Sequence, residues 1–147
     1  MPHVLLKIIN ATNNPLPHYA TEGAAGMDVR AFLQEPVVLK SLERTAVPTG
    51  LFFEIPAGYE VQVRPRSGLA LKQGITCLNT PGTIDSDYRG ELKVILINLS
   101  AEPQTIHTGD RIAQLVLQKV EQVQWQPVQT LTETTRSSGG FGSTGKK

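Results

Sequence analysis

The sequence predicts an all-β fold of the sandwich, jelly-roll or barrel type. Short runs rich in β-branched and other apolar residues recur along most of the chain. Turn-forming clusters, to which 10 prolines and 13 glycines contribute, separate these runs. The sequence contains neither a long amphipathic helical pattern nor an internal repeat. Regularly spaced short strands joined by such turns are typical of packed or closed sheets.

Taken in order, the predicted strands are residues 4–9, 37–39, 45–47, 50–55, 59–63, 74–78, 92–99 and 111–120. Residues 59–63 alternate apolar and polar side chains, as a strand with one buried face does. Clusters of Pro, Gly, Asn and Asp predict turns at residues 13–15, 56–58, 80–82 and 108–110. Only one segment is predicted to be helical: Ser67 is expected to cap a short helix over residues 68–73, which Gly74 would end.

The 147 residues fit one domain. We expect residues 1–129 to form the β-rich core and residues 130–147 a flexible, glycine-rich arm. The arm contains only two large apolar side chains, so it cannot bury enough surface to offset its ordering entropy. It is therefore either a disordered tail or a segment that becomes ordered on a ligand.

Composition excludes several classes of function. A net charge of +1 with scattered basic residues argues against a nucleic-acid partner. The single cysteine, Cys77, excludes a disulfide framework and a multi-thiolate zinc site, and its apolar neighbours predict a buried, inert thiol. With neither a secretory signal nor a membrane span in the sequence, we expect no membrane association and a cytoplasmic location.

Residues 82–91 concentrate two aspartates and a tyrosine between the predicted strands 74–78 and 92–99, where a hairpin turn is expected. Such a loop is either a binding site held by a rigid sheet or an acidic surface turn. Residues 65–70 place Arg66 and Ser67 at a predicted helix start, a combination that suits an anion. The alternative there is a surface arginine followed by an ordinary serine cap.

The arm matches the pattern G-x-G-x-x-G at residues 140–145, but no helix can follow it, so it is not a dinucleotide fingerprint. What remains is a run of free backbone N–H groups around Phe141, preceded by Arg136, which suits folding over a nucleotide. The sequence contains neither the zinc-deaminase signature nor the nucleophile elbow of α/β-hydrolases.

Taken together, five motifs resemble those of the trimeric dUTPases and appear in the order of that family. They are residues 24–31, 65–70, 79 with 82–90, 109–115, and 136–145. The departures are small: Val29 stands where Leu is usual, and Ser137 stands where Gly is common. The resemblance implies a jelly-roll-like or distorted-barrel subunit, assembled as a homotrimer with shared active sites.

The resemblance also implies an activity, the hydrolysis of dUTP to dUMP and pyrophosphate with Mg²⁺, which keeps uracil out of DNA and supplies dUMP for thymidylate synthesis. Asp85 would be the general base, and Tyr88 would pack against the deoxyribose and exclude a 2′-hydroxyl. Uracil would be read by Asn79 and by the backbone near Gly82, Thr83 and Ile84.

The triphosphate would be bound by two further groups of residues. Arg66, Ser67, Gly68 and Gln114 resemble the groups that position phosphates and water. In the arm, Phe141 would stack on the base, and Arg136, Gly142 and Ser143 would meet the phosphates. No direct protein ligand to Mg²⁺ is expected. Asp28 would either support the metal's water shell or order a neighbouring arginine.

Ion pairs that hold turns or the trimer are expected for Asp87, Arg89, Asp110 and Arg111. Two other functions remain open at this point. A dCTP deaminase-like enzyme would share the fold, and a non-catalytic nucleotide-binding module would share the scaffold.

Overall fold

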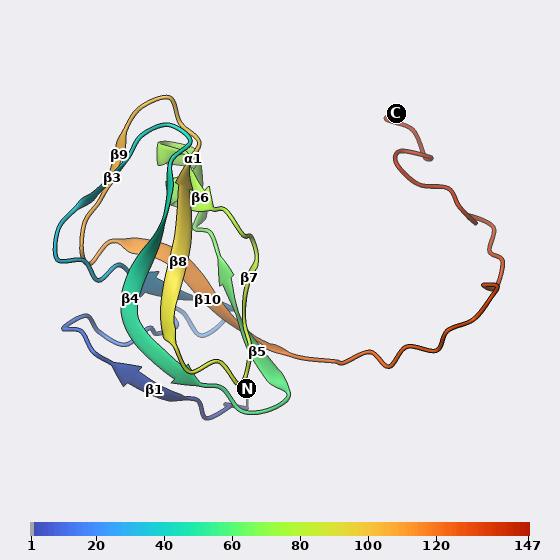
Figure 1. Ribbon diagram of the computed structural model, residues 1–147, viewed down its shortest axis with the longest axis horizontal. Helices are drawn as coiled ribbons and strands as arrows, with labels where there is room; N and C mark the ends of the chain where they lie inside the picture. The colour runs from blue at the N-terminus through green and yellow to red at the C-terminus, as the bar shows by residue number, and fades with distance from the viewer. Residues whose placement is uncertain (1) are drawn as a thin grey trace.

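The computed structural model describes residues 2–147, and strands dominate it (Figure 1). The elements are β1 (Lys7–Asn10), β2 (Met27–Arg30), β3 (Val37–Leu39), β4 (Arg44–Glu54), β5 (Tyr59–Arg64), α1 (Ser67–Gln73), β6 (Ile75–Cys77), β7 (Gly82–Ile84), β8 (Glu91–Asn98), β9 (Gln104–Ile106) and β10 (Arg111–Lys119). Within residues 2–147, no helix is long and apolar enough to cross a membrane.

The strands form three antiparallel sheets. One sheet has the order β1-β4-β8-β6, a second has β2-β10-β5-β7, and β3 pairs with β9. From β4 to β8 the chain passes from one four-stranded sheet to the other at every strand. This alternation is jelly-roll-like, and the sheets remain open rather than closing into a barrel. The all-β prediction is confirmed.

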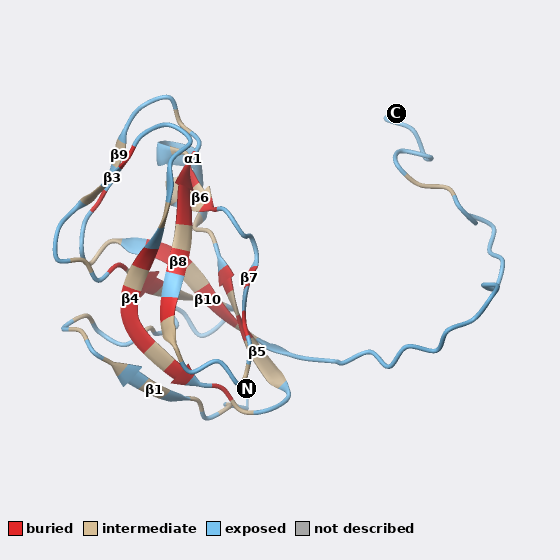
Figure 2. Cartoon of the chain, in the orientation of Figure 1, coloured by how far each residue is buried: buried red, intermediate tan, exposed pale blue. Residues whose placement is uncertain are grey.

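The core lies between the two larger sheets, and both contribute to it (Figure 2). Val47 and Leu96 come from the first sheet and Val29 and Leu115 from the second, and each is at most 1% exposed. The buried Asn98 is fully hydrogen-bonded, since its Nδ2 donates to the carbonyls of Leu39 and Glu102 at 2.9 and 2.8 Å. Hydrogen bonding offsets the cost of burying its amide.

Most predicted strands are confirmed to within a few residues. β4 joins two predicted runs, 45–47 and 50–55, across Pro48, and its pairing with β8 shifts register between Pro48 and Phe52. Strands β2, β7 and β9 were not predicted. The hairpin turn expected over residues 82–91 is wrong in part, because residues 82–84 form β7 and pair with β5. Burial of Ile84 stabilises the pairing of β7 in the second sheet, and the chain then returns to the first sheet at β8.

The helix α1 is confirmed, but its predicted cap is not. Arg66 occupies the N-cap position with extended backbone, and no side chain caps the helix. Ser67 is instead the first helical residue and lies exposed. Gly74 ends the helix as predicted, with φ 68° and its N–H directed to the carbonyls of Ala70 and Leu69.

Beyond β10 the chain leaves the sheets. Residues 121–147 contain no helix or strand, and almost all of them are exposed. They run away from the body as one extended segment (Figures 1 and 2). The division at residue 129 between core and arm stays a prediction.

Candidate active site

Six of the predicted site residues gather around one cavity of about 380 Å³. They are Asn79, Gly82, Thr83, Ile84, Asp85 and Tyr88. Strand β8 forms much of the remaining wall, through residues that include Glu91 and Lys93. We call this space the nucleoside cavity.

The cavity lies at the edges of the two sheets. β7 is the last strand of the second sheet, so its outer edge has no strand partner. β6 pairs with only three residues of β8, Leu96 to Asn98. The free edge of β7 presents backbone donors and acceptors in a row. Such a row can read the polar edge of a base.

Gly82 allows β7 to lie close to Val63 of β5 and to the side chain of Asn79. A Cβ atom there would lie 3.2 Å from the Cβ of Val63 and 3.5 Å from Nδ2 of Asn79. A Cβ atom at position 82 would therefore be tight against β5 and in ordinary contact with the Asn79 amide.

The loop from Asp85 to Gly90 is held by its own hydrogen bonds. The N–H of Tyr88 donates to the carbonyl of Asp85 at 3.2 Å, and Nη1 of Arg89 donates to the carbonyl of Ser86 at 2.7 Å. Arg89 therefore holds the turn through a hydrogen bond to a carbonyl, and its guanidinium also lies 4.0 Å from the Glu54 carboxylate of β4. Asp87 is exposed and has no ion-pair partner within residues 2–147.

A second group of predicted residues lies around Asp28 on β2. Oδ1 of Asp28 accepts a hydrogen bond from Nε of Arg66 at 3.0 Å, and Oδ2 lies 3.6 Å from Nη1 of Arg111. Arg66 also donates through Nη1 to the carbonyl of Arg111 at 3.2 Å. This carboxylate therefore orders neighbouring arginines, which is one of the two roles expected for Asp28, and its role in the metal's water shell stays a prediction.

Gln114 joins this group through the pairing of β10 with β2, which sets it opposite Asp28. Both line a cavity of about 410 Å³ together with the loop before β2. Gly26 keeps the space open, since a Cβ atom there would lie 2.9 Å from Oε1 of Gln114.

On the other side of Arg111, Arg30 and Arg66 line a cavity of about 580 Å³. Ser67 and Gly68 follow Arg66 directly and are exposed. Three guanidinium groups and an exposed helix start suit phosphates. We call this region the arginine cluster: Arg30, Arg66 and Arg111 with Asp28 and Gln114.

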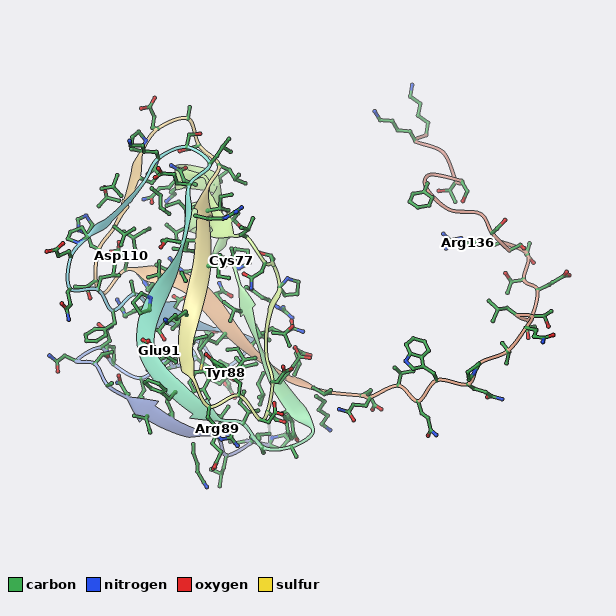
Figure 3. The ribbon with its side chains drawn as sticks, in the orientation of Figure 1. Cys77, Tyr88, Arg89, Glu91, Asp110 and Arg136 are labelled. Atoms are coloured by element: carbon green, nitrogen blue, oxygen red, sulfur yellow. The ribbon has the colours of Figure 1, made fainter. Side chains whose placement is uncertain are left out.

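The predicted residues of the arm lie apart from both groups. Figure 3 places Arg136 far from Tyr88. Nε of Arg136 donates to the carbonyl of Gly139 at 2.6 Å, and Phe141 is fully exposed. The neighbouring Gly142 and Ser143 are exposed as well. One copy of the chain therefore does not bring the five motifs together.

The remaining titratable groups do not add a site. Burial raises the pKa of the Cys77 thiol to about 11, as the predicted inert thiol requires. Oδ2 of Asp110 accepts a hydrogen bond from the N–H of His107 at 2.8 Å, so this carboxylate holds a turn. No group of three or more metal-ligating side chains occurs in the part of the chain that the structure describes.

Some residues that shape the site were not assigned a role from the sequence. Gly26 and Gly90 each precede a strand and contact a predicted site residue, Gln114 and Tyr88 respectively. The available signal was glycine beside a strand, which often marks a close approach. Arg30 was missed because only the fold brings it beside Arg66.

Comparison with known proteins identifies one family. The dUTPase family model matches residues 12–145. The deoxyuridine 5'-triphosphate nucleotidohydrolase of Fusobacterium nucleatum is 60% identical over 146 residues, covering 99% of this chain and 100% of the relative. That of Finegoldia magna is 58% identical over 140 residues, covering 95% and 98%.

Solved structures agree in fold. The Staphylococcus bacteriophage 80alpha dUTPase with dUPNHPP superposes with a TM-score of 0.82 at 24% identity, covering 96% of this chain and 98% of the other. A variant dUTPase from phage phi11 of S. aureus, described as coordinating a structural Mg(II) ion, has a TM-score of 0.76 at 22% identity, covering 88% and 100%. The sequence match, over nearly the full length of both chains, shows that this chain belongs to the dUTPase family.

Proposed function

We propose that this chain hydrolyses dUTP to dUMP and pyrophosphate when a water molecule activated by Asp85 attacks the α-phosphorus. Hydrolysis of dUTP is the activity of the family to which the chain belongs. The observation that supports the proposed roles is the nucleoside cavity, where Asp85, Tyr88 and Asn79 meet the free edge of β7.

The nucleoside cavity accounts for selection of base and sugar. The backbone of residues 82–84 and the amide of Asn79 offer uracil matched donors and acceptors, which cytosine would leave unpaired. Unpaired buried polar groups penalise the wrong ligand strongly. The ring of Tyr88 packs against the deoxyribose and leaves no room for a 2′-hydroxyl.

The chemical step transfers the nucleotidyl group of dUTP, its α-phosphorus with the nucleoside, to water. Asp85 takes a proton from the water molecule while the oxygen of that water bonds to the α-phosphorus. The bond from the α-phosphorus to the oxygen bridging to the β-phosphate breaks, and pyrophosphate leaves with the electron pair. A general base of this kind contributes typically about 10²–10⁴-fold to the rate.

The arginine cluster binds the triphosphate. Arg66 supplies a permanent positive charge, and its hydrogen bond to Asp28 orients the guanidinium group. Ser67, Gly68 and Gln114 add hydrogen bonds to phosphate or water. The substrate would carry Mg²⁺ on its own phosphate oxygens, so that no side chain of the chain is needed as a direct metal ligand. Such an ion neutralises charge that develops on the phosphates.

A complete site needs more than one copy of the chain. In the proposed homotrimer, one subunit supplies the nucleoside cavity, a second supplies the arginine cluster, and the arm of the third closes over both. The separation of these three groups within one chain supports this arrangement. In the arm, Phe141 stacks on uracil, and Arg136 with the backbone of Gly142 and Ser143 meets the phosphates.

Hydrolysis in ¹⁸O-labelled water tests the proposed chemistry. Attack at the α-phosphorus puts the label in dUMP and leaves pyrophosphate unlabelled. Mass spectrometry of both products after a single turnover distinguishes the cases. Label in pyrophosphate would show attack at the β-phosphorus and would remove Asp85 from the proposed role.

A further inference from the structure

We propose that Gly90 is a specificity-determining positioning residue, which gives the enzyme its preference for deoxyribose by letting the hydroxyl end of the Tyr88 ring lie close against the loop. The inference rests on the proposed function, in which Tyr88 contacts the sugar. Gly90 itself contacts no substrate and acts only through the position of that ring.

The ring of Tyr88 lies directly over Gly90. A Cβ atom at position 90 would lie 2.7 Å from Cζ of Tyr88 and 2.9 Å from its Cε1, and it would also overlap the hydroxyl oxygen. Real Cβ atoms essentially never approach other atoms this closely. Even alanine at position 90 would displace either the ring or the loop.

The backbone does not itself require glycine at position 90. Its φ lies outside the left-handed region, whereas six other glycines of the chain have positive φ. A positive φ is therefore not the reason for glycine at this position. The three atoms nearest to a Cβ atom at position 90 all belong to Tyr88.

The same hydroxyl end of the ring is also anchored by a hydrogen bond. The hydroxyl of Tyr88 donates a hydrogen bond to the carbonyl of Glu91 at 2.9 Å. The Glu91 carboxylate in turn accepts a hydrogen bond from the N–H of Gly50 at 3.0 Å, which ties the start of β8 to β4. Because the hydroxyl end of the ring is both hydrogen-bonded to Glu91 and packed against Gly90, the ring is held at the wall of the nucleoside cavity.

A ring held in this way excludes a 2′-hydroxyl by occupying its space. A packed wall of this kind discriminates against an added hydroxyl by about 10²-fold. The methyl group of alanine at position 90 should push the Tyr88 ring aside and reopen part of the space that a 2′-hydroxyl needs. Turnover of UTP should then rise while turnover of dUTP falls, because the deoxyribose loses its packing.

The test is a double-mutant cycle between Gly90→Ala and Tyr88→Ala in the full-length protein. The measurement is kcat/KM for dUTP and for UTP, with melting temperature as the check on folding. We expect Gly90→Ala to lower the ratio of dUTP to UTP by about tenfold or more, with absolute UTP turnover above that of the wild type. In the Tyr88→Ala background, Gly90→Ala should change neither ratio nor rate.

Gly23→Ala is the matched control, because a Cβ atom there meets nothing within 4 Å and its φ is not positive. It should leave the ratio unchanged. If Gly90→Ala lowers dUTP and UTP turnover equally, or acts fully without Tyr88, Gly90 only supports the loop and the inference fails. If the wild type itself does not prefer dUTP, the proposed function fails instead.

Discussion

Asp85 and Asp87 lie two residues apart on the same loop and are both exposed, yet only Asp85 lines the cavity that contains Asn79 and Tyr88. The surrounding loop is braced by Arg89 and by a backbone hydrogen bond, so the two carboxylates keep different surroundings. Asp85 is therefore distinguished from Asp87 by its place at the cavity wall, since the two residue types are the same.

Replacement of Asp85 by Asn tests this difference, because it keeps the shape of the side chain and removes the base. We expect kcat to fall by roughly 10²–10⁴-fold while a non-hydrolysable dUTP analogue still binds. Pyrophosphate release and calorimetric titration measure the two effects. Asp87→Asn is the control, and a comparable loss of kcat there would contradict the assignment of the base.

Asp28 offers a second test at the scale of single residues. Its carboxylate contacts Arg66 and Arg111, so Asp28→Asn should leave both guanidinium groups less well oriented. We expect kcat/KM for dUTP to fall roughly tenfold, the equivalent of about 1.4 kcal/mol. The free energy of unfolding should change by no more than about 1 kcal/mol, because the pair is partly exposed.

Lys7→Gln provides the matched control, since it removes an exposed ion pair with Glu54 that lies outside both cavities. Its kcat/KM should match that of the wild type. Equal losses in the two variants would mean that ion pairs matter here only for folding.

Secondary-structure elements that depend only on neighbouring residues could be predicted from the sequence. The strand alternation and the Gly74 helix stop needed only neighbouring residues, and both were predicted. β7 was missed because three residues are too few to display a period, and its pairing with β5 depends on the fold. Pro48 divided β4 in two because proline usually ends a strand, whereas here it sits beside a register shift.

The same reasoning applies to the site. The residues of the nucleoside cavity are nearly contiguous, from 79 to 95 apart from Ala46 and Val63, so a sequence motif captures most of them. The contact between Asp28 of β2 and Arg66, the N-cap residue of α1, joins residues 38 positions apart, and spacing alone gives no sign of it. The site residues are thus predicted by resemblance to family motifs, and the fold shows which of them lie together.

The arm is the element whose role is most open to test. Residues 136–147 make almost no contact with the core, so deleting them should leave the melting temperature unchanged. Activity should fall by orders of magnitude, because stacking, phosphate contacts and water exclusion are lost together. Near-normal dUTP turnover by the truncated protein would show that the arm is an inert tail.

At the scale of the whole molecule, the proposed sharing of sites predicts complementation. Asp85→Asn lacks the base, and the arm deletion lacks the lid, but trimers refolded from both contain sites with each part intact. Roughly a quarter of the sites in a one-to-one random mixture should be complete. Activity of the mixture above the sum of its parents supports sharing, and strict additivity would mean that each chain builds its own site.

Selective hydrolysis of dUTP can be measured as product release from four nucleotides under identical conditions. With Mg²⁺ present, we expect pyrophosphate from dUTP far faster than from dCTP, dTTP or UTP, and no ammonia from any of them. The contrasting dCTP deaminase of similar fold would release ammonia from dCTP, and a non-catalytic binding module would release nothing. Either result, or turnover of UTP comparable to that of dUTP, would contradict the account given above.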